Sequence, residues 1–148
     1  MTETYFLTLK SVPMTNKGKV FAYTHFPYVE PFNESLEALQ EQVGGLIEHF
    51  IIDESLNDRR IDMWIDDEGK LKGHKPTFLL CDKDGNPLDA IVGNCVFTKY
   101  DGDGNTFGLS QEDINIVMSW LGTLPFVPVH KNDDESLEYA FVVKGFGG

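Results

Sequence analysis

The sequence predicts an α+β fold, a single domain with a mostly antiparallel β-sheet and two short helices. Three observations support this class. The chain has 148 residues, the usual size of one domain around one hydrophobic core. Most apolar segments are short, rich in aromatic and β-branched residues, and bounded by turn-forming residues, as strands are. Only residues 33–45 and 110–122 have the periodicity of amphipathic helices. Residues 1–122 are expected to form the domain, and residues 123–148 a C-terminal β extension packed on it.

The first two expected strands form a hairpin. Residues 4–9 (TYFLTL) and 19–26 (KVFAYTHF) are both apolar and rich in aromatic side chains. The Asn-Lys-Gly stretch at residues 16–18 lies between them and is typical of a turn. We therefore expect the chain to begin with a pair of strands.

The first expected helix lies within residues 33–45 (NESLEALQEQVGG). Asn33 can cap its N-terminus, and the glycine pair at residues 44–45 can end it. One face is apolar, formed by Leu36, Leu39 and Val43. Three acidic residues at positions i, i+3 and i+7 share an outward face: Glu34, Glu37 and Glu41.

The middle of the chain reads as a series of strands and turns. Residues 46–52 (LIEHFII) and 61–66 (IDMWID) are expected strands, followed by turns at 67–70 and 82–88 and a strand at 89–100. Alternation in the second strand places Ile61, Met63 and Ile65 on one face and Asp62, Trp64 and Asp66 on the other.

Trp64 has two interpretations. A helix can cover the second face of the sheet, in which case Trp64 packs beneath it. Alternatively Trp64 stands exposed between Asp62 and Asp66 and anchors an interface. The first interpretation is favoured. The variant Trp64→Ala separates the two: a large loss of stability indicates the packed residue, and lost partner binding with unchanged melting indicates the interface.

The second expected helix begins after Ser110 and ends near Gly122. Ser110 is a good N-cap, and acidic residues in the first turn suit the helix dipole. Two terminal strands follow, one in VPVHK (127–131) and one in EYAFVVKGF (138–146), joined by an acidic loop.

The charge distribution indicates a basic partner. The net charge is −12. Half of the 24 acidic residues fall between positions 30 and 68, where Arg59 and Arg60 are the only lysine or arginine residues. Direct nucleic-acid binding needs a basic surface, so this charge argues against it. A protein with a basic surface is the natural complement.

The expected compartment is the cytoplasm. No apolar run approaches the roughly 20 residues that cross a bilayer, and the N-terminal segment lacks the features of a signal peptide. Cys81 and Cys95 lie in apolar segments, and reduced buried thiols are favoured over a disulfide.

No catalytic motif is evident. The four histidines, His25, His49, His74 and His130, are scattered without metal-ligand spacing. Neither GxSxG nor GxxxxGK[ST] occurs. Carboxylates are plentiful, but nothing selects one acid–base pair. We therefore expect a protein that is not an enzyme.

Residues 101–112 resemble a calcium-binding loop in part. Asp101, Asp103, Asn105 and Glu112 match positions 1, 3, 5 and 12 of an EF-hand. Thr106, however, replaces the glycine of position 6, and the preceding segment is typical of a strand. A polar turn into the second helix is favoured, with weak calcium binding as the alternative.

Four stretches in order resemble a domain of unknown function common in phages, plasmids and conjugative elements of Firmicutes and other bacteria. They are SLEALQEQVGGLIE, IDMWIDDEGKLKG, PLDAIVGNCVF and DGDGNTFGLSQEDI. The matching positions include Val43, Gly44, Gly45, Glu68, Gly69, Lys70, Leu71, Gly93 and Asn94. The resemblance implies a small accessory protein of a mobile element in a bacterial cytoplasm, and it implies no catalytic residue.

Together these observations predict a non-enzymatic phage or mobile-element protein that binds a host protein. An anti-defence inhibitor of the anti-CRISPR or antirestriction type, which occupies a nucleic-acid-binding surface, fits best. The expected binding residues are Glu34, Glu37, Glu41, Asp62, Trp64, Asp66 and Asp67. The alternatives are a protein that binds a small nucleotide signal, or a calcium-binding protein through residues 101–112.

Overall fold

The computed structural model describes residues 3–146. Within these residues lie three helices and ten strands. The helices are α1 (Leu36–Val43), α2 (Glu54–Asp58) and α3 (Gln111–Thr123). The strands are β1 (Tyr5–Asn16), β2 (Lys19–Pro31), β3 (Ile47–Phe50), β4 (Ile61–Asp66), β5 (Pro76–Cys81), β6 (Pro87–Val92), β7 (Cys95–Tyr100), β8 (Thr106–Phe107), β9 (Phe126–Lys131) and β10 (Leu137–Val143).

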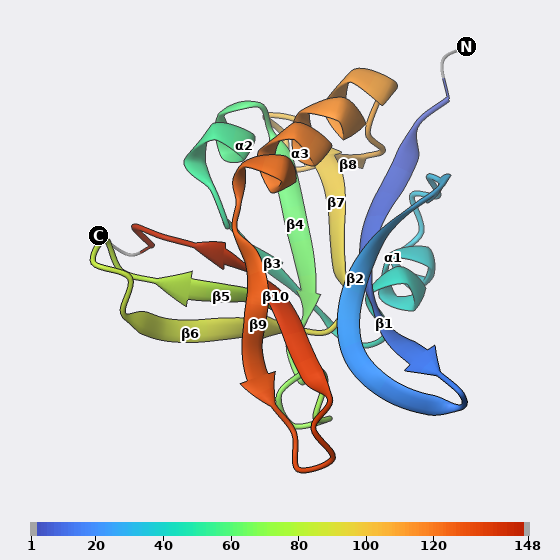
Figure 1. Ribbon diagram of the computed structural model, residues 1–148. Coiled ribbons are helices and arrows are strands. Elements are labelled where there is room, and N and C mark those ends of the chain that lie inside the picture. Colours follow the sequence, from blue (N-terminus) through green and yellow to red (C-terminus); the bar gives the residue numbers. More distant parts are fainter. Residues whose placement is uncertain (1–2, 147–148) are drawn as a thin grey trace.

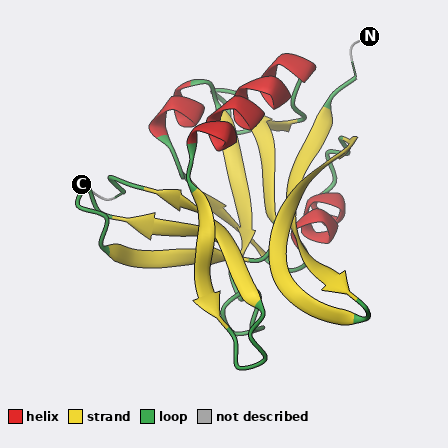
Figure 2. Ribbon diagram, viewed as in Figure 1, coloured by secondary structure: helices red, strands yellow, loops and turns green. Residues whose placement is uncertain are grey.

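The strands described here form one curled sheet, as Figure 2 shows. Its order is β3-β4-β7-β1-β2-β10-β5-β6, with β8 beside β7 and β9 beside β10. Strand β10 runs parallel to both β2 and β5, and the other pairs are antiparallel. This arrangement confirms the expected α+β class with a mostly antiparallel sheet.

The N-terminal hairpin is confirmed and is longer than expected. Strands β1 and β2 pair from Tyr5 and Pro31 to Asn16 and Lys19. The turn between them uses left-handed backbone at Lys17 (φ 51°) and Gly18 (φ 77°). That conformation lets a two-residue turn follow the twist of the strands.

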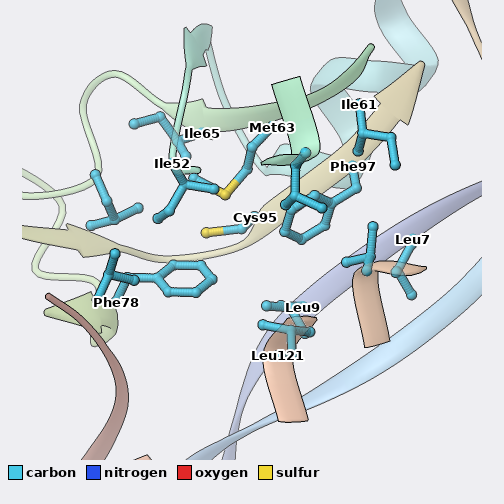
Figure 3. Close-up of a cluster of buried hydrophobic side chains, with 14 of the residues drawn as sticks. Leu7, Leu9, Ile52, Ile61, Met63, Ile65, Phe78, Cys95, Phe97 and Leu121 are labelled. Atoms are coloured by element: carbon cyan, nitrogen blue, oxygen red, sulfur yellow. The ribbon is translucent and has the colours of Figure 1, made fainter. Parts of the chain in front are cut away.

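The main core lies inside the curl of the sheet, and α2 and α3 close one end of it (Figure 1). Side chains from strands that are distant in sequence, such as Leu9, Met63, Phe78 and Phe97, point toward one another there (Figure 3). Helix α3 adds its apolar stripe, Ile114, Val117 and Leu121. The 3.6-residue spacing of this stripe directs all three side chains into the core.

A second, smaller core lies on the opposite face of the sheet, beneath α1. Leu39 and Val43 of the helix pack against Phe6 and Val96 of the strands. Because side chains alternate along a strand, Phe6 and Val96 face α1, whereas Leu7 and Phe97 face the main core. The sheet is therefore covered on both faces in this region.

The first expected helix is present, but its cap is not Asn33. Ser35 is the N-cap, and its hydroxyl accepts a hydrogen bond from Ala38 N at 3.1 Å. Asn33 supports the cap instead, because its Oδ1 accepts from Ser35 N at 2.9 Å. The expected second helix after Ser110 is confirmed as α3, with a full capping box between Ser110 and Asp113.

Helix α2 was not predicted. The expected strand at residues 46–52 is only four residues long, and the chain then forms one helical turn after Asp53. Asp53 caps this turn by accepting from Ser55 N at 3.0 Å. A single turn has no repeating periodicity, so the cap is the only signal that the sequence carries.

Two expectations for the middle of the chain were wrong. Residues 67–70 do not close a hairpin, since β4 pairs with β3 and β7 while β5 pairs with β10 and β6. Residues 89–100 are not one strand. They divide at Gly93 and Asn94 into β6, beside β5, and β7, between β4 and β1. Gly93 has φ 82°, which a continuous strand cannot accommodate.

The segment after residue 122 contributes the expected pair of strands, and β10 lies within the sheet between β2 and β5.

Both cysteines are buried, and neither forms a disulfide, as expected. Burial raises the pKa of the Cys95 thiol to about 12. Among residues 3–146, no helix has the length and apolar character needed to cross a membrane.

Candidate functional site

The seven residues expected to bind a partner do not form one surface. Glu34, Glu37 and Glu41 are exposed, the last two on α1 and the first just before its cap. Among residues 3–146, none of the three glutamates forms an ion pair. Leu36, expected in the apolar stripe of this helix, is instead exposed over 56% of its surface at the start of α1. We call Glu34, Leu36, Glu37 and Glu41 the acidic face of α1.

The orientation of this face follows from the packing of the helix. Leu39 and Val43 are buried against the sheet, which turns the glutamates outward. Gly44, in left-handed backbone at φ 89°, ends the helix, and its N–H donates to Gln40 O at 2.8 Å.

Asp62 is not part of an acidic surface, contrary to expectation. Its side chain is buried, and His49 Nε2 lies 2.7 Å from its Oδ1. Burial raises the pKa of Asp62, and the hydrogen bond from His49 only partly offsets this. Asp62 therefore serves to hold β3 against β4.

Trp64 packs beneath α1, in agreement with the first of its two interpretations. It is partly buried against the second core, and its Nε1 donates to Thr98 Oγ1 at 2.8 Å. The side chain is not an exposed aromatic ring surrounded by carboxylates, because both flanking aspartates are buried.

Asp66 is also buried, in a cluster of charged groups. Lys72 Nζ lies 2.7 Å from its Oδ2 and His74 Nε2 lies 3.5 Å away, while Glu68 N donates to its Oδ1 at 2.9 Å. Burial alone would raise the pKa of Asp66, but these hydrogen bonds hold it below the ordinary value. Of the three expected aspartates, only Asp67 is exposed.

The residues around Asp101 form a turn. Asp101 Oδ1 accepts from Asp103 N and Asn105 N, both at 2.9 Å, and its Oδ2 accepts from the Asn105 amide at 2.9 Å. These bonds, those from Asn105 above all, lower the pKa of Asp101. Residues 82–86 (Asp-Lys-Asp-Gly-Asn) repeat the pattern, with Asp82 accepting from Asp84 N and Asn86 N.

The four residues of the alternative calcium interpretation are not grouped as a metal site in the described part of the chain. Glu112 lies in the first turn of α3, and the Asp101 carboxylate is already engaged in the hydrogen bonds of the turn. Asp113, next to Glu112, caps the helix with Ser110 and forms an ion pair with Lys99 at 3.1 Å. Across the described part of the chain, no three histidine, cysteine, aspartate or glutamate residues are grouped to hold a metal ion.

A cavity of about 300 Å³ opens at the C-terminal end of α1. Separate parts of the chain line it: β1, β2, the end of α1, and the loops that precede β5 and β7. Its polar lining consists of Ser11, Tyr23, His74, Lys75 and Asn94. Sequence reasoning missed this site because residues more than eighty positions apart contribute to it.

Two glycines explain how closely these loops approach. A Cβ on Gly45 would collide with the Lys72 ammonium and the Asp66 carboxylate. A Cβ on Gly93 would lie 3.0 Å from the His74 ring. Both positions belong to the stretches that carry the family resemblance. A hydrogen bond from Asn94 Nδ2 to Gln42 O, at 3.2 Å, joins two of these stretches. The structure thus brings three of those stretches together at the end of α1.

Comparison with known proteins assigns a family. None of the curated proteins and none of the solved structures matches the chain. The model of one protein family, described as a domain of unknown function (DUF3846), matches residues 20–122. These residues include α1, the buried Asp66 cluster and the loops that precede β5 and β7. The chain therefore belongs to the DUF3846 family.

Proposed function

We propose that the protein is a non-enzymatic binding protein that uses the acidic face of α1 to bind a basic surface of another protein. The observation that carries this proposal is the set of exposed glutamates, Glu34, Glu37 and Glu41, which lack ion pairs within residues 3–146.

The chemistry of this face suits protein recognition. Carboxylates of one sign, on a chain with a net charge of −12, attract a basic partner over long range and orient its approach. Leu36, at the start of α1, adds an exposed apolar side chain, which burial in an interface would stabilise. Asp67 lies after β4 and is a further exposed carboxylate available to a partner.

Under this proposal, the buried members of the seven residues expected to bind a partner support the helix rather than contact the partner. Trp64 packs beneath α1, and Asp62 and Asp66 fix the strand on which it rests. Their substitution would change partner binding indirectly, through the position of the helix. A substitution at Glu34, Glu37 or Glu41 would act directly.

The proposed partner is a host protein whose basic surface handles nucleic acid. The resemblance to phage, plasmid and conjugative-element proteins motivates this choice. In that setting the protein acts in the bacterial cytoplasm as an anti-defence inhibitor of the anti-CRISPR or antirestriction type. It occupies the surface that the nucleic acid would otherwise use.

The test compares two triple variants that remove the same charge. One is Glu34→Gln, Glu37→Gln and Glu41→Gln. The control is Asp84→Asn, Asp103→Asn and Glu112→Gln, three exposed acids on loops and on α3. Each variant and the wild type serve as bait in a bacterial lysate at low and high ionic strength, and retained proteins are identified by mass spectrometry.

We expect the wild type and the control to retain one basic, nucleic-acid-handling protein at low ionic strength and to lose it at high ionic strength. The α1 variant should fail to retain it, and Leu36→Ala should weaken retention. Equal retention by the α1 variant would overturn the proposal. Equal loss in both triple variants would show that overall charge, not this face, drives the binding.

A further inference from the structure

The cavity at the end of α1 is walled by backbone at three points. Gly44 (φ 89°), Gly73 (φ 73°) and Gly93 (φ 82°) all line it, and all three adopt left-handed backbone. A side chain other than glycine is strained in that conformation. At Gly44 and Gly73 no atom lies within 4 Å of the place where a Cβ would stand, so these two turns border open space, whereas Gly93 lets the His74 ring approach its backbone.

Hydrogen-bonding groups converge on this space. Ser11 and Tyr23, which both carry hydroxyl groups, line the cavity from β1 and β2. Within residues 3–146 neither hydroxyl has a hydrogen-bond partner. The Asn94 amide uses its Nδ2 for Gln42 O, which leaves its oxygen available to a ligand. Cavities with a few convergent polar groups are the usual form of small-molecule sites.

Lys75 supplies a fixed positive charge. Its Nζ lies 3.0 Å from the buried carboxylate of Glu138 and 4.7 Å from the centre of the Tyr23 ring. An ammonium group has three N–H donors, and the carboxylate requires one of them. The side chain is about one-third exposed (34%), so the remaining donors can reach a ligand.

The local charge balance differs from that of the whole chain. Lys72 compensates Asp66, and Lys75 compensates Glu138. His74, which also lines the cavity, adds an imidazole that can donate a hydrogen bond. On a chain with net charge −12, Lys75 is a cation that lines this cavity and is already held in position.

We infer that this cavity binds a small molecule that carries a phosphate or carboxylate group. Lys75 and His74 would contact the oxyanion, and Ser11, Tyr23 and Asn94 would bind the polar remainder. The volume of about 300 Å³ is at the small end of ligand pockets, which excludes a dinucleotide. This inference does not depend on the acidic face of α1, since the two sites share no residue.

The test uses three probes, inorganic phosphate, citrate and AMP, each titrated into the ¹⁵N-labelled full chain and followed by amide chemical shifts. We expect saturable shifts in the amides of Gly73, His74, Lys75, Gly93 and Asn94, with a dissociation constant in the millimolar range or below. Saturable shifts with phosphate and AMP but not with citrate would show that the ligand carries a phosphate group. Saturable shifts with citrate alone would show that it carries a carboxylate group.

Two variants identify the groups responsible. Lys75→Gln together with Glu138→Gln replaces a charged pair by a neutral one, so no buried carboxylate is left unpaired. This variant should weaken binding about tenfold, because a hydrogen bond to a charged group is lost. Tyr23→Phe keeps the ring, removes the hydroxyl, and should weaken binding a few-fold.

The matched control is Lys70→Gln, on the same loop but lining a different cavity. It should leave the affinity within about twofold, since exposed distant charges are screened. The inference is overturned if no probe produces saturable shifts at these amides up to about 10 mM. It is also overturned if Lys70→Gln weakens binding as much as the double variant does.

Discussion

His25 donates the hydrogen of its Nε2 to the carbonyl oxygen of Pro76 over 2.7 Å, and so joins β2 to the start of β5. The same nitrogen lies 3.1 Å from the carbonyl oxygen of Tyr139 in β10. Both partners are acceptors, so Nε2 carries the proton and Nδ1 does not. Within the described residues, the buried Nδ1 has no hydrogen-bond partner. This imidazole joins three strands at the point where β10 stops pairing with β2 and begins to pair with β5.

We predict that His25 makes the protein less stable in mild acid. Burial lowers the pKa of His25, and the two hydrogen bonds to carbonyls only partly offset this. The unfolded chain therefore binds a proton near pH 6.5, whereas the folded chain binds it only at lower pH. Below about pH 6.5 the free energy of unfolding should fall, by at most about 1.4 kcal/mol per pH unit.

Urea denaturation at several pH values between about 5 and 8 tests this prediction. Other groups titrate too, so the measured quantity is the difference between the wild type and His25→Gln. The variant should be less stable at pH 8, because glutamine lacks the ring that packs against Phe126 and Phe141. Its stability should also depend less on pH. Parallel pH profiles for the two proteins would contradict the prediction.

The sequence predicts those parts of the fold that depend on local chemistry. Ser110 with Asp113 caps α3, and the Asn-Lys-Gly stretch turns β1 into β2. The pairing of distant strands does not leave such a signal. Strand β10 lies between β2 and β5 because of long-range packing, and the division of residues 89–100 depends on the backbone of a single glycine. The prediction that Asp62 and Asp66 are exposed was wrong. It assumed that one face of β4 is open to solvent, whereas the main core covers one face and α1 with neighbouring side chains covers the other.

We predict that Asp66 contributes far more to stability than Asp89, although both pair with a lysine of the same loop. Asp66 is buried and paired with Lys72, whereas Asp89 and Lys70 are both exposed. Asp66→Asn should lower the free energy of unfolding by about 1–3 kcal/mol, and Asp89→Asn by less than about 1 kcal/mol. Urea midpoints at neutral pH measure both losses. Equal losses would show that the buried cluster has no special role in stability.

We predict opposite effects of alanine at two glycines. Gly93 has φ 82° and faces the His74 ring, so Gly93→Ala should destabilise the fold by about 1–3 kcal/mol. Gly122 lies in α3 with open space around it, so Gly122→Ala should stabilise the fold by about 0.5–1 kcal/mol. Thermal unfolding distinguishes the two directions. A neutral Gly93→Ala would show that the loop before β7 can adopt another conformation.

We predict that the turn at Asp101 works without calcium. Its carboxylate already accepts hydrogen bonds from Asp103 N, Asn105 N and the Asn105 amide. The melting temperature should therefore be the same in millimolar calcium and in chelator. Asp101→Ala should lower it equally in both conditions, and so should Asp82→Ala in the matching turn. A rise in melting temperature with calcium that Asp101→Ala abolishes, and Asp82→Ala does not, would restore the calcium interpretation.

The loop between β9 and β10 forms a similar turn, but Glu135 occupies the left-handed position that glycine occupies in the other two turns. Glu135 N donates to Asn132 O at 2.9 Å, as Gly85 N donates to Asp82 O at 3.0 Å. Glu135 has φ 72°, close to the left-handed backbone that Gly85 (φ 86°) and Gly104 (φ 84°) adopt in the other two turns. A non-glycine side chain is strained there, so Glu135→Gly should raise the free energy of unfolding by about 0.5–1 kcal/mol.

The control for this last substitution is Glu135→Ala, which removes the same carboxylate and its weak ion pair with Lys131 but keeps a Cβ. If backbone strain is the cause, glycine stabilises the protein and alanine does not. If both substitutions stabilise it equally, the gain comes from reducing the negative charge of the chain, and Glu135 is not strained. Urea denaturation of the three proteins at two ionic strengths distinguishes these causes, because charge repulsion is screened by salt and backbone strain is not.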